Sequence, residues 1–278
     1  MHFALLRFPS MDPVAFWLGP LPIRWYGLAY AAGLLAGWQY VKRLVATSRF
    51  WPGATAPFSA EKVDDLLLYM VAGVVVGGRL GDVLLWDTSR FAEHPIEILQ
   101  VWRGGMSFHG GFIGCVLAIA LFCRLHRAPL LTVFDLASAA TPIGLFLGRI
   151  ANFINGELWG KPSTVPWAMI FPAPDAGGVP RHPSQLYEAG LEGIVLFLLC
   201  WWLVYRRGAL KKPGLVAGVF TAGYGLARIV SEHFREPDVS SVVSSTLVST
   251  GTLYSLPMVA VGIAMIVAAE WHTRRAAA

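Results

Sequence analysis

Residues 131–160 read LTVFDLASAATPIGLFLGRIANFINGELWG, an apolar run of helical length that ends in a polar, glycine-rich segment. A transmembrane helix needs about 20 mostly apolar residues, and residues 131–152 supply them. The whole chain has the same character, because 55% of its 278 residues are hydrophobic and only 14% are charged. Soluble domains carry about 25% charged residues. The stretch therefore predicts a membrane helix, and the composition extends this prediction to the whole chain.

Further apolar runs divide the chain from end to end. The predicted spans are residues 24–42, 64–86, 109–125, 131–152, 186–205, 213–232 and 253–270. We therefore expect an all-α, polytopic membrane protein with seven transmembrane helices, in which residues 1–278 form a single integral membrane domain. Prolines and an aspartate interrupt the residues before the first span, so we expect an extended interfacial segment there rather than a cleaved signal peptide. The sequence shows no repeat, which argues against an internally duplicated transporter.

The Lys and Arg residues between the spans predict the orientation of the chain. With the N-terminus outside, twelve of them lie in inward-facing segments and seven in outward-facing ones. We therefore expect the N-terminus outside and the C-terminus inside, with residues 87–108, 153–185 and 233–252 facing outward. These segments are richer in Gly, Pro, Trp and polar residues than the inner loops. The chemistry is expected on this face, around a small outward-facing polar region at 153–185.

Several classes of function lack support in the sequence. The net charge is +5, but the basic residues cluster between apolar runs, which argues against a nucleic-acid-binding surface. Cys115, Cys123 and Cys200 lie in apolar stretches without a CxxC motif or His at metal-ligand spacing, so we expect small buried hydrophobes and no metal. No GxxxxGK[ST], HExxH or GxSxG motif occurs, and the pattern of CDP-alcohol phosphotransferases is missing. We expect no cofactor.

Arg149 lies near the outer end of a predicted span, where a charge costs a few kcal/mol even on lenient scales. Asn152 follows one helical turn later, and Asn155 and Glu157 come within a few residues. The neighbouring glycines let the backbone turn or approach other groups closely. Interface anchoring explains so much polarity poorly, so the pattern favours a functional role for Arg149.

Two other arginines lie within or at the edge of predicted spans. Arg228 shares a helix face with Tyr224 and Glu232, because the three are spaced at i, i+4 and i+8. They could form a neutralised pair that locks the helix, or an anion site in which Glu and Tyr position the arginine. Arg79 is expected to pair with Asp82 at i+3, among small residues typical of tight helix packing, with a phosphate contact as the alternative.

His109 begins the third span between glycines that expose its ring. It could be a hydrogen-bonded polar group or a general base, because imidazole has the pKa best suited to proton transfer near neutral pH. Tyr26 is by default an aromatic-belt residue. At the start of the fifth span we expect Ser184 or Gln185 to cap the helix with Glu188 in its first turns, although His182 and Gln185 could also reach a lipid head group.

Together these residues predict an outward-facing site for a phospholipid head group, since guanidinium groups bind phosphate oxygens in a bidentate manner. Residues Gly148–Gly160 closely resemble the signature of the prolipoprotein diacylglyceryl transferase family. The other matching stretches follow in the same order: Trp25–Gly27, Gly77–Gly81, Gly104–Gly111, His182–Tyr187 and Phe234–Asp238. The chain departs from the family at Asp82, where an aromatic residue is usual, and at Thr250–Thr252, which replaces a Met-Gly-Gln element.

The resemblance implies a reaction at the bacterial cell inner (plasma) membrane, with the active site toward the periplasmic face. A diacylglyceryl group would move from phosphatidylglycerol to the lipobox cysteine of a lipoprotein precursor, and glycerol phosphate would be released. The implied partners are this lipid, these precursors and the bilayer. Carried over by motif position, the implied site residues are Tyr26, His109, Arg149, Asn152, Glu157, Gly160, Tyr224, Arg228 and Glu232.

This chemistry suggests a hypothesis for each group. His109 takes the thiol proton, Arg149 and Arg228 hold the phosphate, and the remaining polar residues orient them. The alternative from another class is a transporter of phospholipids or small anions. A transporter needs polar residues through the full membrane depth, whereas the acidic residues of the inner halves lie only near the inner surface. These are Asp64, Asp65, Asp135 and Glu270.

Overall fold

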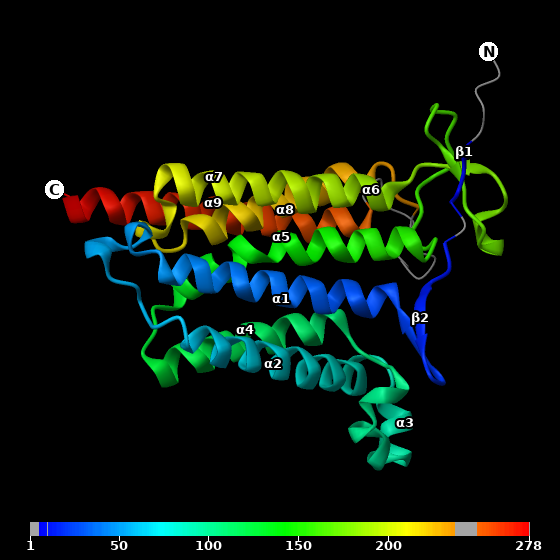
Figure 1. Ribbon diagram of the computed structural model, residues 1–278, viewed down its shortest axis with the longest axis horizontal. Helices are drawn as coiled ribbons and strands as arrows, with labels where there is room; N and C mark the ends of the chain where they lie inside the picture. The colour runs from blue at the N-terminus through cyan, green and yellow to red at the C-terminus, as the bar shows by residue number, and fades with distance from the viewer. Residues whose placement is uncertain (1–5, 10, 237–248, 278) are drawn as a thin grey trace. The chain divides into compact units, whose positions relative to one another are not determined.

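The computed structural model describes residues 6–9, 11–236 and 249–277, and the chain divides into two compact units (Figure 1). Unit 1 comprises Met1–Tyr40 and Asp135–Ala278, and unit 2 comprises Val41–Phe134. The division passes through two long helices, α1 (Trp25–Ala46) and α5 (Leu130–Ile154). The packing of the helices is therefore described within each unit separately.

Unit 2 is built on the tight packing of two helices, α2 (Lys62–Leu85) and α4 (Phe108–His126). Glycines line the contact: a methyl group on Gly81 would lie 2.7 Å from Gly110 Cα, and one on Gly77 would lie 2.8 Å from Gly114 Cα. Small residues one turn apart let two helix backbones approach closely. The tight packing predicted around Gly77–Gly81 is confirmed.

The remaining elements of unit 2 are short. The turn after α1 contains the 3₁₀ helices η1 (Ser48–Phe50) and η2 (Pro52–Ala54). The connection from α2 to α4 contains α3 (Thr88–Glu93), η3 (Pro95–Leu99) and η4 (Val101–Arg103).

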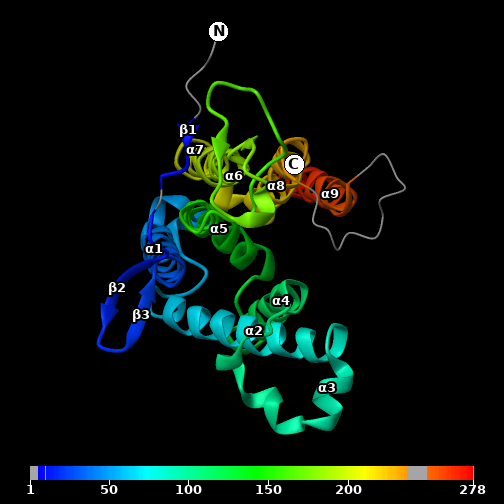
Figure 2. The ribbon, with the colours of Figure 1, turned by 90° about the vertical axis from the view of Figure 1, so that its right-hand side faces the viewer.

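Unit 1 contains α5 and three further long helical segments that run side by side (Figures 1 and 2). The first is continuous over residues 184–207 and comprises α6 (Ser184–Glu188), a π-helical segment η6 (Ala189–Val195) and α7 (Leu196–Arg207). The others are α8 (Leu215–Glu232), which follows the 3₁₀ turn η7 (Ala209–Lys211), and α9 (Thr250–Ala277).

Small residues and one buried carboxylate fix the packing of α8. A methyl group on Gly218 would lie 2.9 Å from Gly262 O of α9, so these two helices pack backbone to backbone. Asp135 of α5 is fully buried and accepts the N–H groups of Gly214 at 2.7 Å and Ala217 at 2.8 Å. The first N–H groups of a helix have no partner within the helix, so Asp135 satisfies those of α8.

One end of unit 1 carries short strands. The strands β1 (Leu6–Arg7), β4 (Met169–Ile170) and β5 (Pro180–Arg181) form one sheet, in which β1 is parallel to β4 and β4 antiparallel to β5. A hairpin joins β2 (Val14–Leu18) to β3 (Leu21–Arg24). The prediction of an all-α fold missed these strands, because such short pairings leave no alternating pattern in the sequence. The extended N-terminal segment was predicted and is confirmed over its described residues.

The region 153–185 folds onto this N-terminal segment. Phe8, Phe171 and Ala176 form a small buried core, and the rings of Phe8 and Phe171 lie 5.3 Å apart. The 3₁₀ turn η5 (Pro174–Ala176) closes this core. The predicted outward-facing loop region is thus an ordered part of unit 1.

Among the residues that the structure describes, five helices are long and apolar enough to cross a membrane: α2, α4, α5, the segment 184–207 and residues 251–275 of α9. Their large apolar side chains are widely exposed, for example Leu68 at 68% and Val267 at 61%. Such surfaces are unfavourable in water and suit lipid. The two other predicted spans coincide with the helices α1 and α8. The chain is therefore a predominantly helical membrane protein.

Candidate active site

Unit 1 contains a buried cluster of ionised side chains contributed by three helices and the turn after α8. Its members are Arg149 of α5, Glu188 and Glu192 of the segment 184–207, Arg228 and Glu232 of α8, and Arg235. The side chains of both Glu188 and Glu192 are 0% exposed. Among the described residues, three arginines face three glutamates, so their formal charges balance. A buried ion is tolerated only with such pairing, because desolvation alone costs several kcal/mol.

Arg149 bridges two carboxylates of the neighbouring helix. Its Nη1 lies 2.9 Å from Glu188 Oε2, while Nη2 and Nε donate to Glu192 Oε2 at 3.0 and 3.2 Å. The planar guanidinium group can make both contacts at once, which an ammonium group could not do. Two glutamates therefore fix the orientation of Arg149.

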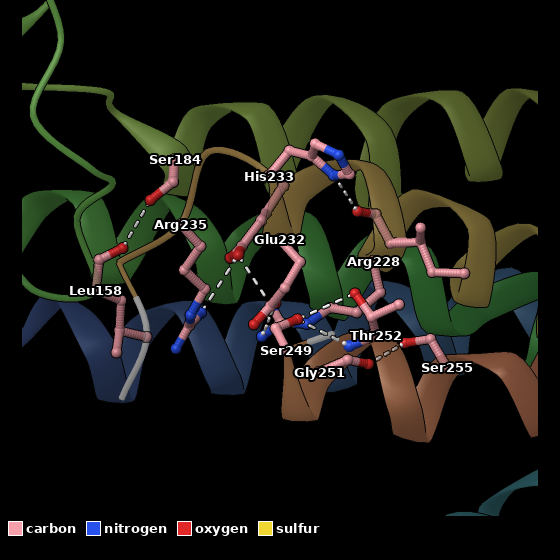
Figure 3. A network of polar contacts seen from close by, with 12 residues as sticks. Leu158, Ser184, Arg228, Glu232, His233, Arg235, Ser249, Gly251, Thr252 and Ser255 are labelled. Carbon is pink, nitrogen blue, oxygen red and sulfur yellow. Dashed lines mark hydrogen bonds and ion pairs between the residues drawn. The ribbon is translucent and has the colours of Figure 1, made fainter. Parts of the chain in front are cut away.

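Glu188 is the centre of the cluster, because its two oxygens contact all three arginines. Its Oε1 accepts from Arg228 Nη1 at 3.0 Å and from Arg235 Nη1 at 3.3 Å, whereas Oε2 faces Arg149. Figure 3 shows Arg228 and Arg235, the two arginines that share Oε1 of Glu188. One buried carboxylate thereby ties α5, α8 and the turn after α8 to the helix 184–207.

The position of both glutamates depends on the π-helical segment that begins after Glu188. The hydrogen bonds of a π-helix run from residue i to residue i+5 and so widen the helix locally, and such segments are frequent at functional sites. Glu188 ends α6 and Glu192 lies within the π-helical turn, and both carboxylates reach the single guanidinium of Arg149. Glu192 Oε1 is buried and has no hydrogen-bond partner among the described residues.

The signature segment leaves α5 in a tight turn built around Glu157. Its Oε1 accepts from Asn152 Nδ2 at 2.7 Å and from Asn155 Nδ2 at 3.4 Å. Gly156 and Leu158 both have positive φ angles, 65° and 59°. Positive φ is unusual for a leucine, and local strain of this kind tends to persist at functional sites. The turn therefore needs support from outside.

Ser184 and Gln185 provide that support, which corrects the prediction that they cap their own helix. Pro183 takes the cap position and no side-chain cap bond is formed. Ser184 Oγ instead donates to Leu158 O at 2.9 Å, and Gln185 Nε2 donates to Glu157 O at 2.5 Å. Both side chains are 0% exposed and face the signature turn, which sequence spacing alone does not reveal.

Gly160 lies between two other backbone segments. Its N–H donates to His182 O at 2.8 Å, and it pairs with Arg235 in an isolated bridge. A methyl group on Gly160 would lie 2.7 Å from His182 Cβ and would collide with Phe234 O. Only glycine fits this gap, so packing alone accounts for its presence, whether or not it also contacts a substrate.

Tyrosines from two helices adjoin the cluster. Tyr26 and Tyr30 of α1 lie with their hydroxyl oxygens 3.3 Å apart. Tyr30 interacts electrostatically with Arg149 and Glu157, and Tyr224 of α8 does so with Arg149 and Arg228. The structure thus gathers the predicted Tyr26, Tyr224 and Arg149 in unit 1 and adds Tyr30.

The start of α9 meets Glu232, the partner of Arg228. The predicted i, i+4 pair is confirmed, with Arg228 Nη2 3.0 Å from Glu232 Oε2. Figure 3 shows Glu232 beside Gly251 and Thr252, and a methyl group on Gly251 would lie 2.6 Å from the Glu232 carboxyl carbon. Ser249 Oγ accepts from Thr252 N at 3.2 Å and so caps α9. The atypical Thr250–Thr252 element therefore adjoins a predicted site residue, and negative charge is favourable at this helix end.

His182 lies among aromatic side chains at the start of the helix 184–207. Its Nδ1 is 3.0 Å from Tyr187 OH, which also accepts from Trp167 Nε1 at 2.6 Å. Partial burial lowers the pKa of His182 below its usual value, because desolvation disfavours the imidazolium ion. The neutral ring can therefore share a hydrogen bond with Tyr187.

The other predicted site residues, Arg79 and His109, belong to unit 2. Arg79 pairs with Asp82 at 3.4 Å, as predicted, and its guanidinium also donates to backbone carbonyls of residues 97–105. This leaves it buried and engaged with the protein rather than presented to a phosphate. His109 is the second residue of α4 and is exposed, as the flanking glycines predicted.

Sequence reasoning missed Glu192 and Arg235 and placed Glu188 only in the first turns of its helix. Glu192 could have been found, because it is a carboxylate inside a predicted span and carries the same cost that singled out the arginines. Arg235 follows the end of α8 and gives no comparable signal. Its place is set by the backbone pairing with Gly160.

These features define a class of protein: a helical membrane protein whose helices enclose a charge-balanced cluster of arginines and glutamates beside a strained polar turn. The family profile described as prolipoprotein diacylglyceryl transferase matches residues 13–268. The chain belongs to this family, as the resemblance in its motifs predicted.

Individual relatives are similar in sequence to this chain over nearly its whole length. The phosphatidylglycerol–prolipoprotein diacylglyceryl transferase of Rhizobium meliloti (strain 1021) is 52% identical over 263 residues, covering 94% of this chain and 93% of that protein. The protein of the same name from Rhodopseudomonas palustris is 52% identical over 279 residues, with 100% and 96% covered. That of Beijerinckia indica is 54% identical over 268 residues, with 95% and 96% covered.

Proposed function

We propose that this chain transfers the diacylglyceryl group of phosphatidylglycerol to the lipobox cysteine of lipoprotein precursors. The observation that carries the proposal is its identity of about half, over almost the full length, to transferases named for this lipid and these precursors. The reaction forms a thioether and releases glycerol phosphate. The cysteine sulfur forms a bond to the glyceryl carbon, and the bond from that carbon to the phosphate oxygen breaks.

In our proposal, the arginines of the cluster bind the phosphate of the lipid head group. Arg149 and Arg228 are each 16% exposed, whereas the glutamates that orient them are fully or largely buried. Prearranged donors stabilise charge that develops on a leaving group without reorganising during the reaction. The glutamates supply the fixed orientation, and the arginines supply the donors for glycerol phosphate as it departs.

The polar residues around the cluster complete the proposed binding site. Asn152 and Glu157 shape the turn beside Arg149, and Tyr224 and Glu232 flank Arg228 on α8. Tyr26 joins them through Tyr30. Gly160, His182 and Gln185 contribute through the packing of the signature turn, and a direct contact with the head group is part of the proposal for each.

His109 is the proposed general base, which removes the proton from the acceptor thiol because the thiolate is the nucleophile. Its imidazole is exposed at the start of α4, as a base must be to meet an incoming thiol. Substitution His109→Gln should lower turnover roughly 10²- to 10⁴-fold, the usual contribution of a general base. Near-normal turnover of this variant would remove the base assignment.

We further propose that all seven predicted spans cross the bacterial inner membrane, with the N-terminus outside and the C-terminus inside. The distribution of Lys and Arg supports this orientation, which places the residues 153–185 on the outer face. Precursors exported across this membrane would then meet the Arg–Glu cluster from the side on which their cysteine emerges.

Purified protein in phosphatidylglycerol vesicles, given a synthetic lipobox peptide, tests the function directly. Expected products are free glycerol phosphate and a peptide heavier by one diacylglyceryl group, detected by mass spectrometry. A peptide with Ser in place of the cysteine is the control and should remain unmodified. Absence of both products from folded protein would contradict the proposed transferase activity. Movement of the lipid across the bilayer without transfer to the peptide would instead favour a transporter.

A further inference from the structure

We propose that Arg79 is a positioning residue for His109, because it fixes the path by which the chain enters α4. This inference rests on the proposed function, in which His109 is the base. All the residues that carry the argument lie in unit 2.

Arg79 is a buried cation that is bound almost entirely by backbone carbonyl groups. Its side chain is 7% exposed. It donates to Ile98 O at 2.9 Å, Gly104 O at 2.8 Å, Gly105 O at 3.0 Å, Glu97 O and Asp82 Oδ2 at 3.4 Å. One rigid guanidinium thereby joins two carbonyls of the 3₁₀ helix η3 to the carbonyls of the glycine pair Gly104–Gly105.

This arrangement offsets two desolvation costs at once. A buried guanidinium needs acceptors on all its edges, and carbonyls at the ends of short 3₁₀ turns need donors. Asp82 supplies the compensating charge from the same helix face, three residues along. The donors of Arg79 are thus directed at the protein, which argues for a structural clamp rather than a phosphate contact.

The clamped segment leads directly to His109. Ser107 N donates to Gly78 O at 2.9 Å, so the residues Gly78 and Arg79 of α2 hold both ends of the stretch 104–107. Ser107 Oγ then accepts from Gly110 N at 3.3 Å and caps α4. His109 follows two residues after Ser107, between this cap and the close contact of Gly110 with α2.

Two sequence features acquire a reason from this geometry. A methyl group on Gly105 would lie 2.8 Å from Arg79 Nη1 and would collide with Asp82, and its φ is +77°. Glycine is therefore required where the clamp closes. Asp82, which departs from the aromatic residue usual in the family, is the carboxylate partner of the clamp.

The test compares Arg79→Lys and Arg79→Gln with Arg90→Gln as a matched control. Arg90 lies in α3, within the connection that Arg79 binds, and its exposed side chain contacts the carboxylates of Glu97 and Asp87 and the ring of Phe91. Each Arg79 variant should lower kcat roughly 10- to 100-fold, since small misplacements of a reacting group have effects of this size. KM for phosphatidylglycerol should stay within about twofold, and Arg90→Gln should match wild type.

A double-mutant cycle with His109→Gln separates positioning from general loss of structure. If Arg79 acts through His109, adding Arg79→Lys to His109→Gln should change kcat by less than about twofold. If Arg79→Lys lowered kcat by the same factor with His109 present and with His109→Gln, the inference would be overturned. A raised KM with unchanged kcat would overturn it as well. Wild type without transferase activity would instead refute the proposed function.

A second readout does not depend on residual turnover. The rate at which diethyl pyrocarbonate modifies His109, measured by mass spectrometry, should change at least about twofold in Arg79→Lys and remain at the wild-type value in Arg90→Gln. An unchanged rate in folded Arg79→Lys would overturn the inference.

Discussion

Glu188 illustrates how much one side chain determines in this protein. It is completely buried in the membrane part of unit 1, yet its carboxylate contacts Arg149, Arg228 and Arg235. Replacing such a group leaves neighbouring charges buried without compensation, which costs about 3–5 kcal/mol when one partner of a buried pair is removed. The energetic role of Glu188 is therefore to make three buried cations tolerable, and its geometric role is to aim them.

Substitution Glu188→Gln should lower both stability and activity. We expect a loss of about 3–5 kcal/mol in the free energy of unfolding and a fall in turnover of roughly 10- to 100-fold. Thermal unfolding in detergent and the vesicle transfer assay measure the two effects.

The matched control for Glu188→Gln is Glu236→Gln, which removes a carboxylate that is 43% exposed and paired with Arg181. Arg181 itself is largely buried, but it keeps its bonds to the carbonyls of Ala176 and Gly160, so we expect a smaller loss of stability than in Glu188→Gln. Equal losses of stability and of turnover in the two variants would show that Glu188 does not hold the cluster together.

His182 should make the stability of the fold depend on pH. Burial lowers its pKa below about 6.5, the value expected in the unfolded chain. On acidification through this value the unfolded state therefore binds more protons than the folded state, and stability decreases. The thermal midpoint should decrease as the pH is lowered from about 7 to about 5, and this decrease should be smaller in His182→Gln. The same pH slope in both proteins would contradict this expectation.

At the scale of elements, the signature segment is a turn held by other parts of unit 1. Leu158 and Gly156 adopt positive φ, and Ser184 and Gln185 bind the carbonyls on either side of this strained point. The π-helical segment that follows carries Glu192 to the same arginine that the turn presents. The turn and the helix 184–207 thus form one structural unit around Arg149.

Gly160→Ala should disrupt this unit by steric overlap. The added methyl group would meet His182 and Phe234, and overpacking of this kind costs about 1–3 kcal/mol. We expect a lower thermal midpoint together with reduced transfer activity. Reduced activity with an unchanged midpoint would instead indicate that Gly160 acts through a substrate contact.

Gly148→Ala is the control from the same signature. Among the described residues, nothing beyond its chain neighbours and its own helix backbone lies within 4 Å of the methyl group it would add, and alanine is favoured over glycine within a helix by about 1 kcal/mol. This variant should keep the thermal midpoint of wild type or raise it slightly.

At the scale of the whole molecule, the prediction concerns which helices cross the bilayer. Residues that flank opposite ends of α1, and likewise of α8, should be labelled from opposite sides of the membrane. We expect Leu18→Cys and Glu236→Cys to react with a membrane-impermeant maleimide in spheroplasts. Arg49→Cys and Lys211→Cys should react only after permeabilisation. Wild type, which retains its three native cysteines, gives the background.

Labelling of both members of a pair from one side would show that the helix between them does not cross. Reversed labelling of both pairs would show that the chain has the opposite orientation. In that case the residues 153–185 would face the cytoplasm, and the proposed meeting with exported precursors would fail.

The sequence alone determined the positions of the long helices and the pairs within them. The apolar runs predicted the ends of the long helices to within about four residues, except that α9 continues to Ala277, beyond the predicted end at residue 270. They succeeded because the length of a membrane helix is set by the thickness of the hydrocarbon layer. Arg79 with Asp82 and Arg228 with Glu232 were predictable for a similar reason, since residues three or four apart on a helix are neighbours. Such features depend only on local geometry.

Only the tertiary structure decided how the signature arginine is held. Arg149 meets Glu188 and Glu192, which are about 40 residues away in sequence, because α5 packs beside the helix 184–207. Ser184 and Gln185 face the signature turn for the same reason, although their sequence position suggested a cap. Spacing defines a helix face, but helix packing chooses its partner, and the partner of a buried charge is what determines its chemistry.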